Sequence, residues 1–342
     1  MFDKDLLKKK FVSADCVKKL DAPILTKDDM PYPSSLVFNA GVIKFKGKYV
    51  MAFRNDYGIT KEEFEGGKRG FNTTVGIAFS DNGIDGWRVV EKPLFDSMDN
   101  VKVKSEIRRY SDPRLTVVDG VPYLSLALDS RHGIHGVFAR LNDDFTEAEI
   151  ISTTVPDNRN MVLFPEKVNG YFTRLERPMP VYGRGDCDRF DLWLSQSPDL
   201  VFWGKSRLVL GVEHVPYAND KIGPAAPPVK TEKGWLATFH AVDLDTQTGK
   251  NGWEECWQKR YTAGIMLLDL NDPSKIIAKT ETPFIAADRD FENENGFRCD
   301  VIFPGGMILE DDREVKIYYG SADTVECLAT AKLDDIFELL GV

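Results

Sequence analysis

"GVIKFKGKYVMAFRN", residues 41–55, contains two short apolar runs separated by a lysine–glycine corner. "TTVGIAFSDNGIDGW", residues 73–87, continues the pattern with a third run. Apolar, aromatic and β-branched residues between Gly, Asn or Asp corners indicate strands joined by tight turns, and hence a small antiparallel sheet. Such a sheet cannot bury both of its faces alone, so it must pack against other copies of the same unit.

Four further segments of the chain repeat this pattern. They are residues 114–145, 164–203, 227–277 and 306–340. Sheet-forming repeats of about 40 to 50 residues are typical of β-propellers. We therefore predict an all-β fold, a five-bladed β-propeller. A β-sandwich is the competing interpretation, but it does not predict five similar hairpins. We expect residues 1–342 to form one domain, with short helices near its ends at residues 3–11 and 333–340.

Composition excludes several classes of function. The chain has 342 residues, of which 42% are hydrophobic and 11% aromatic, and a formal net charge of -10. An acidic chain repels nucleic acid and anionic membranes, so we expect neither as a partner. No apolar run approaches the roughly 20 residues of a membrane span, and the N-terminus lacks the apolar run of a secretory signal, so we expect a cytoplasmic protein. The five scattered cysteines lack CxxC spacing, which argues against a disulfide framework and a structural zinc site.

Charged residues at equivalent blade corners should converge on the central funnel of a propeller. The candidates are Arg54, Asp112, Arg114, Arg177, His240 and Asp323. Asp112 precedes a proline in "YSDPRLT", which pushes its backbone towards an extended conformation. A carboxylic acid held in this way can act as a general acid or base. The plainer interpretation is that Asp-Pro only starts a turn.

Four basic side chains could together form a phosphate site. They are Arg159, Arg177, Lys221 and His240. Guanidinium groups bind phosphate oxygens in a bidentate manner, and an ammonium and an imidazole around one funnel would add to that. Alternatively, each of them pairs with one of the 54 acidic residues on the surface. His132 and His135 have ligand-like spacing but lack a third partner, so we predict no metal site.

With these residues assembled, the sequence resembles glycoside hydrolase family 130, the β-mannoside phosphorylases and their few hydrolytic relatives. The motifs that carry the resemblance are FNAG, DPR, LFPEKVNG closing with RP, KIGP, GWL, LLDLNDPSK, VIFPGG and YYGSADT. Three positions depart from the family pattern: the serine before Asp112, Glu176 before RP, and the alanine pair after the lysine of KIGP. These departures concern the preference for the acceptor sugar, so the resemblance does not predict which linkage is cleaved.

The resemblance implies roles for individual residues. Asp112 would be the general acid, with its proton reaching the glycosidic oxygen through a hydroxyl of the bound mannose. The residues implied to hold inorganic phosphate are Arg159, Arg177, Lys221, His240 and Tyr261. The positions implied to hold the mannosyl unit are Asn39, Arg54 and Asp323. Arg114, two residues after Asp112, is counted with the substrate-binding candidates.

The expected activity is inverting phosphorolysis of a β-mannoside to α-mannose 1-phosphate and a shortened sugar. The bond would be β-1,2 or β-1,4, in a manno-oligosaccharide or in a mannosyl-glucose or mannosyl-N-acetylglucosamine. Phosphate is the co-substrate, and no other cofactor is expected. The sequence leaves open whether the protein forms a homo-oligomer. One alternative is a β-mannosidase, in which a second carboxylate about 6.5 to 9.5 Å from the acid activates water; Glu176 keeps that option open. Another is a non-catalytic propeller that binds carbohydrate or protein.

Overall fold

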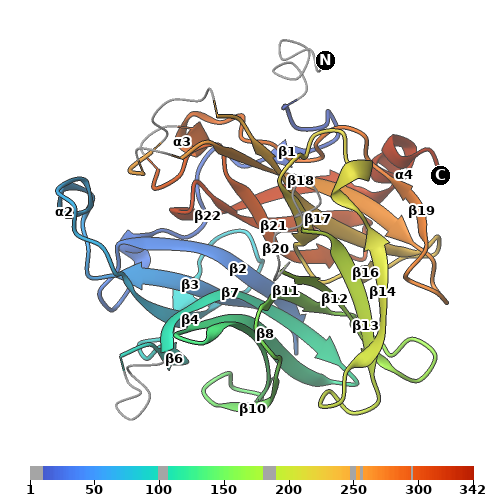
Figure 1. The fold of residues 1–342 in the computed structure, drawn as a ribbon, viewed down its shortest axis with the longest axis horizontal. Coiled ribbons are helices and arrows are strands. Elements are labelled where there is room, and N and C mark those ends of the chain that lie inside the picture. The colour runs from blue at the N-terminus through green and yellow to red at the C-terminus, as the bar shows by residue number, and fades with distance from the viewer. Residues whose placement is uncertain (1–10, 99–106, 180–189, 247–251, 255–256, 294–295) are drawn as a thin grey trace.

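Five antiparallel sheets surround a common centre in the computed structural model (Figure 1), which confirms the predicted β-propeller. The structure describes residues 11–98, 107–179, 190–246, 252–254, 257–293 and 296–342. No helix among these residues is long and apolar enough to cross a membrane. Of the N-terminal helix predicted at residues 3–11, residues 3–10 lie outside the described part of the chain, and Phe11 lies within it.

Each blade is numbered along the chain, with its innermost strand first. Blade one contains β2 (Leu36–Phe45), β3 (Lys48–Tyr57), β4 (Asn72–Ser80), β5 (Arg88–Val89) and β6 (Phe95–Asp96). Blade two contains β7 (Ile107–Val118), β8 (Val121–Ser130), β9 (Gly133–Leu141) and β10 (Ala148–Thr153). Blade three contains β11 (Asn158–Leu163), β12 (Phe172–Pro178), β13 (Leu192–Ser197) and β14 (Gly204–Leu210).

The last two blades follow the same order. Blade four contains β15 (Lys221–Pro224), β16 (Val229–Lys230), β17 (Trp235–Leu244), β18 (Lys259–Leu268) and β19 (Ile276–Lys279). Blade five contains β20 (Ile302–Leu309), β21 (Glu314–Ser321), β22 (Val325–Lys332) and, as its outer strand, β1 (Lys18–Lys19). Among the described residues, helices α2 (Lys61–Glu65), α3 (Asp290–Asn293), η1 (Lys27–Asp29) and η3 (Val212–His214) lie in the connections, and α4 (Leu333–Leu340) follows the last strand.

Two-residue turns join the first two strands of blades one and two, as their sequences predict. Lys46 and Gly47 have φ of 48° and 79°, and Asp119 and Gly120 have φ of 52° and 79°. Positive φ at both central residues matches the right-handed twist of the paired strands. These turns therefore fix the register of β2 with β3 and of β7 with β8.

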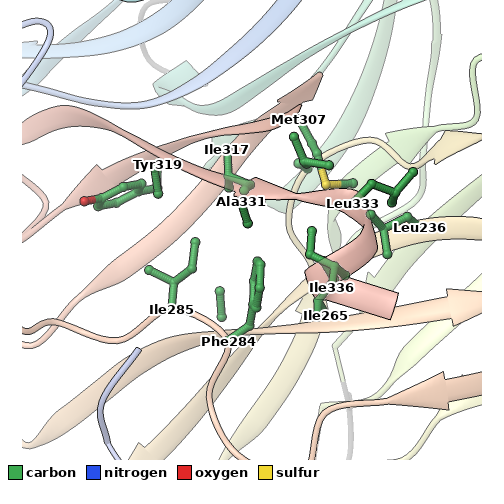
Figure 2. Close-up of a cluster of buried hydrophobic side chains, with 14 of the residues drawn as sticks. Leu236, Ile265, Phe284, Ile285, Met307, Ile317, Tyr319, Ala331, Leu333 and Ile336 are labelled. Carbon is green, nitrogen blue, oxygen red and sulfur yellow. The ribbon is translucent and has the colours of Figure 1, made fainter. Parts of the chain in front are cut away.

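Apolar side chains fill the space between neighbouring blades. Five clusters of buried residues each lie between a different pair of adjacent blades. The cluster between blades four and five also takes in α4, which buries Leu333, Ile336 and Phe337 (Figure 2). Burial of apolar surface between sheets is the main favourable term here, so each blade is stabilised by its two neighbours.

The N-terminal segment closes the ring. β1 pairs antiparallel with β22, with Lys18 opposite Thr330 and Lys19 opposite Ala329. The first and last parts of the chain therefore share one sheet. The sequence does not predict this strand, because a strand of two residues is too short to show an alternating pattern.

The innermost strands of blades one, two and three carry a β-bulge at matching positions. The register shifts lie between Phe38 and Gly41, between Ser111 and Arg114, and between Arg159 and Val162. One residue inside each bulge has positive φ: Asn39 (57°), Asp112 (53°) and Asn160 (57°). A bulge re-aims side chains and leaves residues without a partner strand. Here it directs one polar side chain from each of three blades to the same place.

Candidate active site

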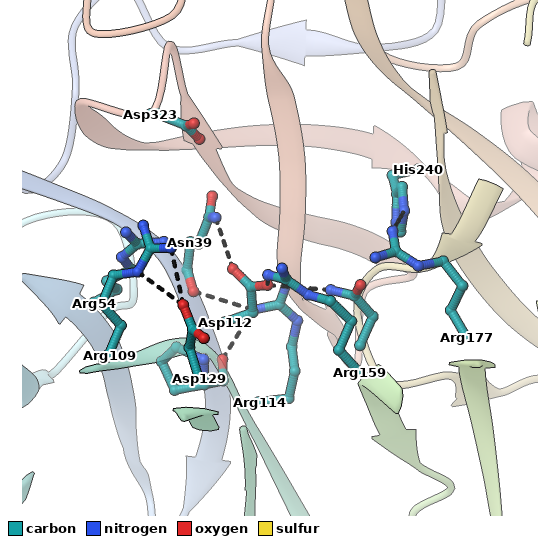
Figure 3. Close-up of polar contacts among 12 residues, drawn as sticks. Asn39, Arg54, Arg109, Asp112, Arg114, Asp129, Arg159, Arg177, His240 and Asp323 are labelled. Carbon is teal, nitrogen blue, oxygen red and sulfur yellow. Dashed lines mark hydrogen bonds and ion pairs between the residues drawn. The ribbon is translucent and has the colours of Figure 1, made fainter. Parts of the chain in front are cut away.

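A cavity of about 230 Å³ lies where the bulged strands meet, and all five blades contribute to its wall. We call it the inner cavity. Of the predicted site residues, it is lined by Asn39, Arg54, Asp112, Arg159, Arg177, Lys221, Tyr261 and Asp323. Figure 3 shows the arginines and Asp323 arranged around Asp112. Of the six charged residues predicted to converge, Arg54, Asp112, Arg177 and Asp323 therefore line the cavity, and Arg114 and His240 do not.

Asp112 is the buried carboxylate at the centre of the inner cavity. Its Oδ1 accepts a hydrogen bond from Asn39 Nδ2 at 2.9 Å, and its Oδ2 accepts one from Asn160 Nδ2 at 3.2 Å. Arg159 forms an ion pair with the same Oδ2. Burial by itself would raise the pKa of this carboxyl, but the positive charges of Arg159 and other arginines outweigh burial and hold the pKa well below its usual range. The carboxylate is therefore ionised in the free protein.

Three cations face one side of Asp112. They are Arg159, Arg177 and Lys221, from β11, β12 and β15. Burial, aided by the charge of Arg159, lowers the pKa of Arg177 to about 10. Burial and the nearby charge of Arg177 lower the pKa of Lys221 to about 7. Like charges at short range in a buried place are unfavourable, so this group is suited to an anion that neutralises it.

Several buried polar atoms at this site have no hydrogen-bond partner among the described residues. They are Nε of Arg159 and Arg177 and Oδ1 of Asn39 and Asn160. Buried donors and acceptors in proteins are nearly always hydrogen-bonded, and leaving one unpaired costs about 1 to 3 kcal/mol. These atoms belong to side chains that line the inner cavity, and the cost of leaving them unpaired favours a polar ligand there.

His240 lies behind Arg177 and does not line the inner cavity. It is fully buried; its Nδ1 lies 3.0 Å from the Pro224 carbonyl oxygen and its Nε2 lies 3.0 Å from Arg177 Nη1. Burial and the charge of Arg177 keep the pKa of this imidazole far below its usual value. The neutral ring therefore donates from Nδ1 to the carbonyl and accepts from Arg177 at Nε2. It positions a cation and adds no charge itself.

Gly223 makes this contact between His240 and Arg177 feasible. A Cβ at Gly223 would lie 2.6 Å from His240 Cε1 and 2.8 Å from Arg177 Cδ. Any side chain at residue 223 would therefore displace the imidazole or the guanidinium group.

Aromatic rings form the wall of blade four. Lys221 Nζ lies 5.4 Å from the centroid of the Tyr261 ring, which stacks on Trp257 at 5.8 Å. Burial raises the pKa of Tyr261, so its hydroxyl stays neutral and can donate a hydrogen bond. Trp257 also lines the inner cavity.

On the opposite side of Asp112, each arginine on the wall is paired with a carboxylate other than Asp112. Arg54 donates from Nε and Nη2 to the two carboxylate oxygens of Asp56, at 2.8 and 2.6 Å, and lies over the Phe38 ring at 4.6 Å. Arg298 Nη1 donates to Asp323 Oδ2 at 3.1 Å. Held in place in this way, the side chains can hydrogen-bond neutral hydroxyl groups.

Arg114 was expected to contact substrate but lies outside the inner cavity. It is 2% exposed, and its guanidinium donates to four main-chain carbonyls, those of Asn39, Pro113, Ala225 and Pro304. These carbonyls belong to blades one, two, four and five. Arg114 therefore ties the innermost strands together beneath Asp112, and it supports the site through Asn39 and Asp112.

Glu176, the second carboxylate that the hydrolase alternative would use, also lies away from the inner cavity. Its Oε2 pairs with Arg174 Nη2 at 2.7 Å and accepts a hydrogen bond from Asn158 Nδ2 at 2.6 Å. Arg174 and Glu176 project from the opposite face of β12 to Arg177, because strand side chains alternate. The three carboxylates other than Asp112 on the wall, Asp56, Asp129 and Asp323, each have an arginine partner.

Asn160 is the main site residue that the sequence analysis missed. A signal existed, because Asn160 follows Arg159 in an innermost strand just as Asn39 lies in FNAG and Asp112 in SDPR. Aligning the three innermost strands would have placed all three residues at one position. For the metal prediction, no group of three or more His, Cys, Asp or Glu side chains within the described ranges could hold an ion. His135 instead contacts the Thr154 carbonyl oxygen, with Nδ1 at 2.8 Å.

Known proteins resemble this chain over most of its length. The family profile of glycoside hydrolase family 130, described as β-1,4-mannooligosaccharide phosphorylase, matches residues 9–341. The β-1,2-mannobiose phosphorylase of Listeria innocua is 33% identical over 232 residues, which cover 68% of this chain and 60% of that enzyme. The 1,2-β-oligomannan phosphorylase of Thermoanaerobacter is 29% identical over 329 residues, covering 92% and 97%. The solved complex of a Listeria innocua β-1,2-mannobiose phosphorylase with β-1,2-mannobiose superposes with a TM-score of 0.77 at 25% identity, covering 95% and 99%.

Proposed function

The chain belongs to glycoside hydrolase family 130, and from that premise we propose that it cleaves a β-mannoside with inorganic phosphate. The products are α-mannose 1-phosphate and a sugar shortened by one unit. The observation that carries the proposal is the group of Arg159, Arg177 and Lys221 beside Asp112. The family profile is described by β-1,4-linked substrates, and the two relatives are named for β-1,2-linked ones, so both linkages belong in the test.

Phosphate is the nucleophile that this set of side chains suits. The anion is already charged, so the protein has to hold and aim it but does not need a base to activate it. Arg159 and Arg177 supply unpaired Nε donors, and Lys221 supplies a further charge. Tyr261 supplies a neutral donor on the same wall. His240 acts indirectly, by fixing Arg177.

Asp112 serves as the general acid, and Arg159 links its protonation to phosphate binding. An acid must carry a proton, whereas Asp112 is ionised while Arg159 is paired with it. Bound phosphate attracts Arg159 and brings negative charge near the carboxyl, and both effects raise the pKa of Asp112. The acid would therefore be protonated when the nucleophile is in place.

Asn39, Arg54 and Asp323 hold the mannosyl unit between Asp112 and the bound phosphate. Asn39 has an unpaired Oδ1, and the Arg54 and Asp323 side chains are held by ion pairs on the wall. Such oriented donors and acceptors match a ring of sugar hydroxyls. Water-dependent hydrolysis is less well supported, because no carboxylate on the described wall is both near Asp112 and without an arginine partner.

The decisive experiment measures sugar release from β-1,2- and β-1,4-mannobiose with and without phosphate. We expect α-mannose 1-phosphate to form in step with mannose, and no release without phosphate. Asp112→Asn should abolish turnover, while Glu176→Gln should retain phosphate dependence. Release that continues unchanged without phosphate would reject phosphorolysis, and its loss in Glu176→Gln would favour the hydrolase.

A further inference from the structure

Glu326 of β22 is a buried carboxyl group that the proposed reaction does not use. Its side chain is fully buried, and its Oε1 has no hydrogen-bond partner among the described residues. Burial raises the pKa of Glu326 to about 8, against the lowering effect of nearby main-chain N–H groups and of the Arg114 charge. The side chain is therefore mostly a neutral acid at pH 7.

This side chain accepts a hydrogen bond from blade one. Glu326 Oε2 lies 3.0 Å from the main-chain nitrogen of Ala40, a residue that is itself fully buried. The pairing of β2 with β3 passes from Phe38 directly to Gly41. The residues between them, Asn39 and Ala40, form the bulge and are left without strand partners of their own. A buried N–H without an acceptor is unfavourable, so Glu326 satisfies a donor that the bulge leaves over.

The bulge of blade two has no such donor. It contains Asp112 and Pro113, and Pro113 matches Ala40. Proline has no N–H, so this bulge needs no acceptor at that place. The preceding residues have the same main-chain conformation in the two blades, with φ of 57° at Asn39 and 53° at Asp112. The carboxyl group of Glu326 is thus matched to a donor that blade one has and blade two lacks.

Asn39 connects the bulge to the candidate active site. Its Nδ2 donates to Asp112 Oδ1 at 2.9 Å (Figure 3), and it lines the inner cavity. Gly320, which pairs with Glu326, packs behind it, since a Cβ at Gly320 would lie 2.2 Å from Asn39 Oδ1 and 2.6 Å from Asn39 N. Positive φ is uncommon outside glycine and persists where the surroundings hold the main chain. The orientation of Asn39 therefore depends on the contact that holds Ala40.

We propose that Glu326 is a positioning residue, which fixes the bulge of β2 through the Ala40 N–H and so orients Asn39 for the reaction. Glu326 itself does not line the inner cavity, so it acts only through the main chain of its neighbour. Because Asn39 contacts the proposed acid and the mannosyl unit, this inference rests on the proposed function. Misplacing a group beside the reacting atoms by about 1 Å can cost about a hundredfold in rate.

Substitutions that keep or remove the acceptor test this role. Glu326→Gln is uncharged like the neutral acid and keeps an oxygen for the Ala40 N–H, while its NH2 replaces an Oε1 that has no partner to lose. Its kcat/KM for the accepted mannobiose should stay within about threefold of the wild type. Glu326→Met removes the acceptor at similar volume, and kcat/KM should fall at least about tenfold.

Two further measurements exclude a general loss of structure. Phosphate affinity in Glu326→Met, measured by calorimetry, should stay within about threefold of the wild type, because the cations proposed to hold phosphate come from blades three and four. Glu292→Gln is the matched control, since Glu292 is equally buried but bonds to Lys19 and Tyr319. It should keep kcat/KM within about twofold at a temperature where both variants are folded. Equal losses in Glu292→Gln and Glu326→Met would overturn the inference.

The bulge of blade two provides a rescue experiment. Ala40→Pro removes the N–H that needs the acceptor and copies the residue that follows Asp112. In the Glu326→Met background it should raise kcat/KM at least about fivefold, because the unpaired donor is gone. If Glu326→Met alone does not fold, the double variant should fold and turn over. Wild-type kcat/KM in Glu326→Met, or a loss that Ala40→Pro does not reverse, would overturn the inference.

Hydrogen exchange separates this inference from the proposed reaction, because it needs no turnover. Exchange in the peptide that covers residues 36–45, followed by mass spectrometry, should be faster in Glu326→Met than in the wild type and in Glu326→Gln. That result supports the role of Glu326 in fixing the bulge, even if sugar release does not depend on phosphate and the phosphorylase proposal fails. Equal exchange in the three proteins would reject this role, whatever the reaction.

Discussion

Asp112 and Arg159 are the two residues whose contact changes most during the proposed reaction. In the free protein, Arg159 neutralises Asp112, and Asn39 and Asn160 donate to the same carboxylate. An ionised carboxylate cannot donate a proton. In the proposed mechanism, a single guanidinium shared between acid and nucleophile would give an order to the reaction, with phosphate first and acid protonation second.

This coupling predicts a proton taken up by Asp112 on phosphate binding. At pH 6, Lys221 is already mostly protonated, since its pKa is about 7, so it contributes little. Calorimetry of phosphate binding in buffers of different ionisation enthalpy counts the protons. We expect a larger uptake in the wild type than in Asp112→Asn, and the difference removes the contribution of phosphate itself. Equal proton counts in the two proteins would contradict the coupling.

The lowered pKa of Lys221 predicts a second pH dependence, in which phosphate affinity falls as the pH rises. Burial and the charge of Arg177 lower its pKa to about 7, so the ammonium loses its proton as the pH rises above 7. Phosphate affinity should therefore fall between pH 7 and 9, because a neutral amine no longer attracts the anion. Lys221→Arg stays charged over this range and should lose less affinity. Identical pH profiles for the two proteins would exclude Lys221 as a phosphate ligand.

At the level of elements, the closure of the ring depends on one buried ionic cluster. Lys19 of β1 has its Nζ 2.7 Å from Glu292 Oε2 and 2.8 Å from Asp288 Oδ1. Glu292 also accepts from the Tyr319 hydroxyl at 2.9 Å and from two main-chain N–H groups. A short strand with two ladder positions is thus attached to α3 and to blade five by side chains.

Glu292→Gln should therefore destabilise the protein strongly. The change removes one of the two carboxylates paired with the buried Lys19 ammonium. Breaking a buried pair completely costs about 3 to 5 kcal/mol, and this is the upper limit here because Asp288 still pairs with Lys19. Denaturant unfolding monitored by tryptophan fluorescence measures the free energy of unfolding. Glu281→Gln is the matched control, because Glu281 pairs with Lys279 and is 67% exposed, and exposed pairs contribute about 0 to 1 kcal/mol. Similar losses of unfolding free energy in the two variants would show that the buried ionic cluster around Lys19 stabilises the protein no more than an exposed ion pair does.

Elements differ in how far their sequences predict them. The Lys46–Gly47 and Asp119–Gly120 turns and helix α4 follow from local turn chemistry and an apolar stripe, and the structure has them where expected. The bulges at Asn39, Asp112 and Asn160 could not be predicted, since a bulge is a property of two paired strands and not of one. Their effect is large, because they aim the side chains that surround Asp112.

For the whole molecule, the sequence predicts which blade corners meet but not how deep each side chain lies. Arg177 and Arg114 look alike as charged residues near blade corners, yet one lines the inner cavity and the other binds main-chain carbonyls below it. His240 likewise lies one layer behind. Depth depends on the packing of five blades at once, and that information is spread over the entire chain. The family resemblance, confirmed by the match over residues 9–341, did not separate these layers.

A site built from all five blades also links ligand binding to the stability of the whole molecule. Phosphate that binds only the folded state stabilises it by about 2.7 kcal/mol at a hundred times its dissociation constant. It also relieves the repulsion among Arg159, Arg177 and Lys221. We therefore expect phosphate to raise the unfolding temperature by about 2 °C or more, relative to chloride at equal ionic strength. Arg177→Ala should lose most of this shift and Arg88→Ala should keep it, because Arg88 lies on the surface away from the site. A shift of equal size in phosphate and chloride would mean that the cations bind no specific anion.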